Sequence, residues 1–78
     1  MSIEKQILER EYQLLLMQLD ERSKSKNFSI KDIEQELASL LVYQGQDWGG
    51  RGELKNAEIQ GHIYAYEIFI KRFKENSV

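Results

Sequence analysis

Apolar residues recur at spacings of three and four positions in three separate segments of this 78-residue chain. Such spacing places the apolar side chains on one face of an α-helix. The helices are expected at about 3–23, 30–44 and 53–75. The chain has no proline, and four of its five glycines lie within 45–52. An all-β domain needs Pro and Gly at its many turns. The sequence therefore predicts an all-α fold with a single domain over 1–78.

Local signals support these helices. Ser29 is expected to be the N-cap of the second helix, because Asp32 follows three residues later in a capping-box pattern. Phe28 precedes the cap and is expected to pack on Ile33 as a hydrophobic staple, and Gly45 is expected to end the helix. The apolar stripes are Leu8, Tyr12, Leu15 and Leu19, then Ile30, Ile33, Leu37, Leu40 and Leu41, then Ile59, Ile63, Tyr66, Ile70 and Phe73.

The β-branched and aromatic run at 63–70 also fits a strand. A lone strand leaves its backbone hydrogen bonds unmade, and the chain offers no second strand to pair with it. A helix is therefore expected there. Short connections favour antiparallel neighbours, which gives an up-down-up three-helix bundle.

The expected helices differ in length, since the first and third are longer than the second. Two long helices that overhang a short one leave apolar surface uncovered, and such surface usually marks an interface. The sequence therefore predicts a homodimer formed through a long-helix face. Its candidate residues are Ile3, Ile7, Phe69 and Phe73.

Small residues recur every four positions in the third helix, at Ala57, Gly61 and Ala65. A glycine inside a helix costs about 1 kcal/mol relative to alanine. Close approach of another helix would offset that cost. The approaching helix belongs either to the same chain or to a partner chain. Replacing Gly61 with Leu would disrupt folding in the first case and only association in the second.

The segment QGQDWGGRGE, 44–53, contains the only tryptophan of the chain. Trp and Arg are enriched in binding hot spots, so Trp48 and Arg51, followed by Leu54, are candidate protein-binding residues. Trp48 has a second interpretation, because it would cover core left open where the second helix stops short. Both interpretations stay open.

Charge is unevenly distributed in this topology, although the net charge is only −2. Basic residues gather at the end of the bundle where the first and third helices finish. This basic pole comprises Arg22, Lys24, Lys26, Lys31, Lys71, Arg72 and Lys74. It reflects either helix-end electrostatics and solubility or an anionic partner. A nucleic-acid accessory protein that contacts phosphates through this pole is therefore the alternative function.

The residues needed for metal binding, for a phosphate-binding loop and for a helix-turn-helix motif are missing from the sequence. The chain has no cysteine, and His62 is its only histidine, which is too few ligands for a metal site. GGRGE is not preceded by a strand or followed by Gly-Lys-Ser/Thr, so it is not a phosphate-binding loop. The long connection after the second helix does not fit a helix-turn-helix. We expect no catalytic residue, no cofactor and no metal.

The longest apolar run near the C-terminus is interrupted by Glu67 and is far shorter than the roughly 20 residues that span a bilayer. The charged N-terminal residues do not fit a signal peptide. We therefore expect a cytoplasmic protein without membrane contact.

The size and composition of the chain resemble those of small accessory and regulatory proteins of bacteria and their phages, although no motif identifies a family. A non-enzymatic adaptor, inhibitor or complex subunit that binds a protein partner is the predicted function.

Overall fold

The computed structural model describes residues 3–45 and 53–76. These residues form three helices, α1 (Ile3–Arg22), α2 (Ile30–Gly45) and α3 (Glu53–Glu75), and contain no strand. The all-α prediction is confirmed, and the predicted helix bounds are met to within one residue. Within the same residues, no helix combines the length and apolar character needed to cross a membrane.

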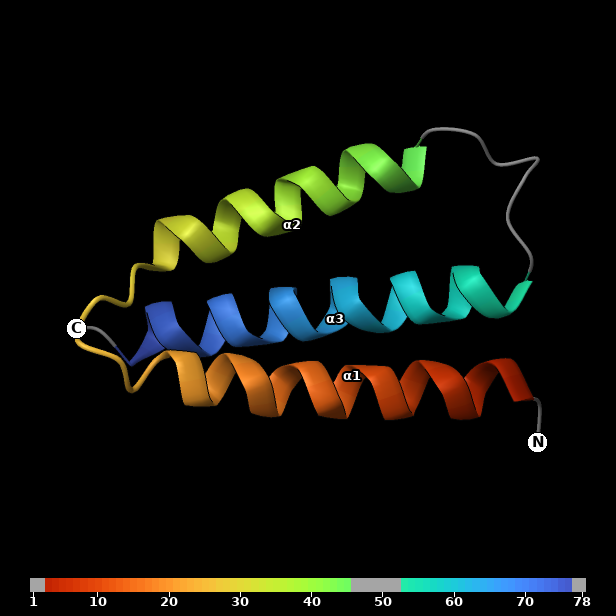
Figure 1. Ribbon diagram of the computed structural model, residues 1–78, viewed down its shortest axis with the longest axis horizontal. Helices are drawn as coiled ribbons and strands as arrows, with labels where there is room; N and C mark the ends of the chain where they lie inside the picture. Colours follow the sequence, from red (N-terminus) through yellow and green to blue (C-terminus); the bar gives the residue numbers. More distant parts are fainter. Residues whose placement is uncertain (1–2, 46–52, 77–78) are drawn as a thin grey trace.

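Helix α3 lies between the other two helices (Figure 1). Helix α1 packs along one side of α3 and runs in the same direction, whereas α2 packs on the other side and runs in the opposite direction. The contact of α3 with α1 is the more extensive one. Figure 1 shows α2 close to α3 at its N-terminal end and farther away towards its C-terminal end. The predicted three-helix bundle with up-down-up order is confirmed, with α3 between α1 and α2.

Ile59 and Ile63 of α3 are each 4% exposed, and the core continues from them to a cluster at the end where α2 converges on α3. Leu19 and Ile33 are completely buried there, and Phe69 is 5% exposed. Phe28, from the connection between α1 and α2, packs against this cluster with its ring centroid 6.0 Å from that of Phe69 and 5.5 Å from that of Phe73. The residue before the N-cap therefore contributes to the core through the rings of Phe69 and Phe73, and its predicted contact with Ile33 stays a prediction.

The middle of the α1–α3 contact depends on the small residues of α3. A Cβ atom added at Gly61 would lie 2.5 Å from the carbonyl oxygen of Leu8 and 3.2 Å from the amide nitrogen of Tyr12. Ala57 and Ala65, one turn before and after, are buried. The two backbones meet only because Gly61 has no side chain. The helix that approaches Gly61 is therefore α1 of the same chain.

Helix α2 begins immediately after Ser29, as the capping pattern predicts. The Asp32 amide donates a hydrogen bond to the Ser29 carbonyl oxygen at 3.2 Å. Before it, the Phe28 amide donates to the Ser25 carbonyl at 3.3 Å. These turns direct the chain from the end of α1 to the far side of α3.

Candidate protein-binding surfaces

Several predicted protein-binding residues already pack within the chain. Ala57, Ala65 and Phe69 are 7%, 0% and 5% exposed, and Gly61 lies against the α1 backbone. Phe73 is half-buried beside Phe28. A partner would reach Gly61 only if α1 moved, whereas Phe69 and Phe73 line a surface groove together with Asp20 and Arg72.

Other predicted residues are accessible. Ile3 at the start of α1 is 64% exposed and Leu54 at the start of α3 is 50% exposed, whereas Ile7 is half-buried. Trp48 and Arg51 lie outside the described residues. The two interpretations of Trp48 therefore stay predictions.

An apolar groove runs along the contact between α1 and α3, and we call it the α1–α3 groove. Its volume is about 390 Å³. It is lined by Leu8, Glu9, Tyr12, Tyr64, Glu67 and Ile68. Tyr64 is 43% exposed, and the two glutamates lie on the exposed rim. Sequence reasoning did not assign Tyr64 to a site, although its spacing of four from Ile68 was a usable signal.

A second groove opens where α2 diverges from α3, and we call it the α2–α3 groove. Its volume is about 710 Å³. It is lined by Arg22, Asp32, Gln35, Glu36, Ser39, Leu40, Tyr43, His62 and Tyr66. Most of these side chains are polar. The groove therefore differs in character from the apolar α1–α3 groove.

Three side chains of the α2–α3 groove join all three helices. The Arg22 guanidinium of α1 donates two hydrogen bonds to Glu36 of α2, from Nη1 to Oε1 at 2.8 Å and from Nη2 to Oε2 at 2.6 Å. The Tyr66 hydroxyl of α3 donates to Glu36 Oε1 at 3.0 Å. We call this trio the Arg22–Glu36–Tyr66 clamp. It holds α2 near α3 and α1 at the end of the molecule that contains the core.

The clamp changes the acidity of its members. The hydrogen bonds from Arg22, and then that from Tyr66, lower the pKa of Glu36 because they stabilise the carboxylate. Burial, and then the hydrogen bond to Glu36, raises the pKa of Tyr66 to about 12. The folded protein therefore favours a charged Glu36 and a neutral Tyr66.

A pH dependence follows from Tyr66. Its pKa is higher in the folded protein, so its contribution to stability is complete below the ordinary tyrosine value of 10.0 and is lost as the pH rises to about 12. Tyr66→Phe removes the ionisable hydroxyl. We expect the free energy of unfolding, measured by urea denaturation, to fall less between pH 10 and 12 in this variant than in the wild type.

Tyr64→Phe is the matched control, because Tyr64 is an exposed tyrosine of the same helix. It should keep the alkaline decline of the wild type. Identical declines in wild type and Tyr66→Phe would contradict the assignment.

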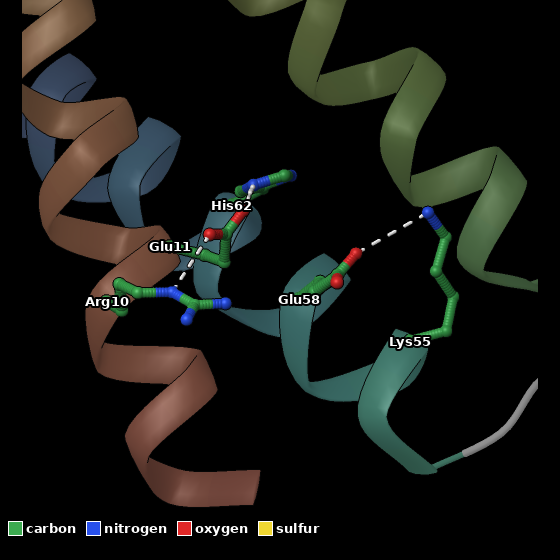
Figure 2. Close-up of polar contacts among 5 residues, drawn as sticks. All are labelled: Arg10, Glu11, Lys55, Glu58 and His62. Carbon is green, nitrogen blue, oxygen red and sulfur yellow. Dashed lines mark hydrogen bonds and ion pairs between the residues drawn. The ribbon is translucent and has the colours of Figure 1, made fainter.

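His62 joins α3 to α1. Its Nε2 lies 3.1 Å from Glu11 Oε1, and Arg10 Nε lies 3.5 Å from Glu11 Oε2 (Figure 2). The same view shows Lys55 and Glu58 of α3 paired at 3.5 Å. Among the described residues, no group of three or more His, Cys, Asp or Glu side chains is placed to hold a metal ion. His62 thus contacts a carboxylate of the neighbouring helix.

Part of the basic pole is already paired with carboxylates. Besides Arg22 in the clamp, Lys24 Nζ lies 3.4 Å from Glu21 Oε1, and Lys74 Nζ lies 3.0 Å from Glu34 Oε2. The other four cations of the pole are exposed. They are Lys26, Lys31, Lys71 and Arg72. Intrachain pairing accordingly weakens the attraction of this pole for an anionic partner.

Comparisons with known proteins find no matching family model, no matching curated protein and no matching solved structure. The class of the protein is therefore defined by its fold, an all-α arrangement of three helices with α3 between α1 and α2. Its function has to be argued from its surfaces.

Proposed function

We propose that this chain is a small, non-enzymatic protein-binding protein, an adaptor, inhibitor or complex subunit, that holds an amphipathic helix of its partner in the α1–α3 groove. The observation that supports the proposal is the apolar lining of this groove. Leu8 and Tyr12 of α1 face Tyr64 and Ile68 of α3 across it. Two aromatic and two aliphatic side chains offer the large, rigid contact area that binding hot spots use.

The shape of the groove favours a helix as the bound segment. It is bordered by two helices that run side by side, and an amphipathic helix binds such a groove by inserting side chains spaced three and four residues apart. Glu9 and Glu67 lie on the rim. Lys or Arg residues beside the apolar anchors of the partner helix would complement them and accelerate association.

The nucleic-acid alternative has less support. It depends on the basic pole, where Arg22, Lys24 and Lys74 are paired with carboxylates of the same chain. Phosphate binding would appear as retention on DNA at low salt that weakens steeply as salt is raised. We propose protein binding as the main function. Retention on DNA at low salt would support the nucleic-acid function instead, and its absence would exclude that function.

A library of displayed helical peptides tests the proposed groove. Selection on the wild-type protein should enrich peptides with apolar residues at spacings of three and four and with adjacent Lys or Arg. Tyr64→Ala should weaken their binding at least about tenfold, equivalent to about 1.4 kcal/mol. Glu67→Lys should weaken the basic peptides selectively. Peptide affinities would be measured by fluorescence anisotropy.

Val42→Ala is the control, because Val42 is an apolar residue on a different helix that is even more accessible than Tyr64, at 61% against 43% exposed. It should leave peptide affinity unchanged. The proposal fails if selected peptides bind Tyr64→Ala as tightly as the wild type, or if no helical peptide is enriched.

A further inference from the structure

Helix α1 carries a second apolar stripe on the side away from α3. Ile3, Leu14 and Met17 are 64%, 48% and 65% exposed, whereas Leu19 is completely buried. The full set is spaced four, three, four, three and four residues apart, and we call it the outer stripe. It consists of Ile3, Ile7, Arg10, Leu14, Met17 and Glu21. Helix α1 thus has two apolar sides, and its own chain covers one of them.

The spacing of the outer stripe indicates what covers it. Alternation of three and four residues averages 3.5, which keeps a stripe in continuous contact with another helix lying alongside. Large apolar side chains exposed in a row also usually mark an interface. The occupant favoured by this geometry is therefore a helix that runs along α1.

The charges on the stripe are self-complementary. Its last four positions are basic, apolar, apolar and acidic, namely Arg10, Leu14, Met17 and Glu21. If a second α1 runs in the opposite direction, Leu14 faces the partner's Met17 and Arg10 faces the partner's Glu21. A two-fold axis then repeats both contacts, as in an isologous dimer. We propose that a second copy of this chain covers the outer stripe from Arg10 to Glu21 and forms an antiparallel α1–α1 dimer.

Arg10 and Glu21 are accessible enough to pair with a second copy of the chain. Arg10 Nε lies 3.5 Å from Glu11, and the Arg10 side chain is 64% exposed. Glu21 lies 3.4 Å from Lys24, and the Glu21 side chain is 76% exposed. Exposed pairs of this kind contribute little to stability. Replacing them by contacts between two chains therefore costs little.

Other pairings of the same stripe bring like charges together. A parallel pair in register places Arg10 against the partner's Arg10 and Glu21 against the partner's Glu21. An antiparallel pair shifted by one heptad sets Leu14 opposite the partner's Arg10, which brings both Arg10 side chains near the axis. In the proposed register, the uncharged Gln13 and Gln18 flank the apolar centre, so no like charges meet beside it.

The dimer is weak but compatible with the proposed function. The helix from Arg10 to Glu21 is roughly 17 Å long. One helix face of that length buries less area than a standard stable interface. We expect a dissociation constant of about 10 to 100 µM. The outer stripe and the α1–α3 groove use different residues of α1. An experiment can therefore rule out the proposed dimer without ruling out the proposed binding groove, and the reverse.

Charge reversal tests the pairing. Sedimentation equilibrium should show a concentration-dependent dimer for the full chain. Arg10→Glu and Glu21→Arg each convert two attractive contacts into two repulsive ones, so each should raise the dissociation constant about tenfold. The double variant Arg10→Glu/Glu21→Arg restores opposite charges in the antiparallel pair and should return the dissociation constant close to the wild-type value.

Lys31→Glu is the matched control, because it reverses an exposed charge on α2 and should not change the dissociation constant. Circular dichroism should show unchanged helix content in every variant, since the reversed side chains are exposed. The proposal is overturned by a wild type that stays monomeric at several hundred micromolar. It is equally overturned by folded single variants that dimerise like the wild type, or by a folded double variant that is not restored.

Discussion

Gly61→Ala is expected to lower the free energy of unfolding by about 2 kcal/mol or more, although alanine is the better helix former. The added methyl group would lie 2.5 Å from the Leu8 carbonyl oxygen and 3.2 Å from the Tyr12 amide nitrogen. Both atoms belong to the backbone, so no side-chain rotation relieves the clash. Helix α1 has to shift along most of its contact with α3. The melting temperature should fall by about 10 °C.

The measurement is urea or thermal denaturation followed by circular dichroism. Gly61→Leu should have a larger effect and leave the chain mostly unfolded, because a domain of this size has little stability to lose. Gln18→Ala, at an exposed position of α1, is the control and should change stability by less than about 0.5 kcal/mol. A folded Gly61→Leu variant of undiminished stability would show that α1 does not approach Gly61 in this way.

Leu19→Ala is expected to cost about 3 kcal/mol, because the side chain is completely buried in the cluster with Ile33 and Phe69. The loss combines the transfer of buried methyl groups with the cavity left between three helices. Leu14→Ala makes the same chemical change in the same helix at a position that is 48% exposed. It should cost less than about 1 kcal/mol.

Both variants should be measured at a few micromolar, below the proposed range of self-association, so that only folding is compared. A Leu19→Ala variant no less stable than Leu14→Ala would contradict the position of the core. The difference between the two variants is the informative quantity, because helix propensity and denatured-state effects largely cancel within the pair.

The helices were predictable because their causes are local. The spacing of apolar residues determines which segments form helices, and Ser29 with Asp32 marks the start of α2. The positions of α1 and α2 around α3 were not predictable from the stripes alone. Gly61 of α3 lies against α1, with Ala57 and Ala65 one turn away on either side, whereas Tyr66 and Phe69 of α3 contact Glu36 of α2 and Phe28 before it. That division leaves α1 and α2 on opposite sides of α3.

The candidate sites were less predictable, because they depend on residues distant in sequence. The need for close approach at Gly61 was visible, but only tertiary structure identifies α1 as the neighbour. Arg22 was assigned to the basic pole, whereas it binds Glu36 and shares that carboxylate with Tyr66. Partners fourteen and thirty residues apart leave no periodic signal. The α1–α3 groove likewise exists only after the two helices pack.

Because α3 lies between α1 and α2, substitutions in α3 and in the outer helices have different consequences. Helix α3 packs extensively against both α1 and α2, whereas α1 and α2 meet each other mainly at one end of the molecule, through the cluster of Leu19 and Ile33 and the Arg22–Glu36 hydrogen bonds. A substitution in α3 can therefore disturb its packing against both α1 and α2. Helices α1 and α2 pack mainly against α3, so substitutions on their solvent-exposed sides leave these packing contacts in place. In such an arrangement the sequence of the middle helix is constrained by the fold, whereas the exposed sides of the outer helices can change to bind different partners.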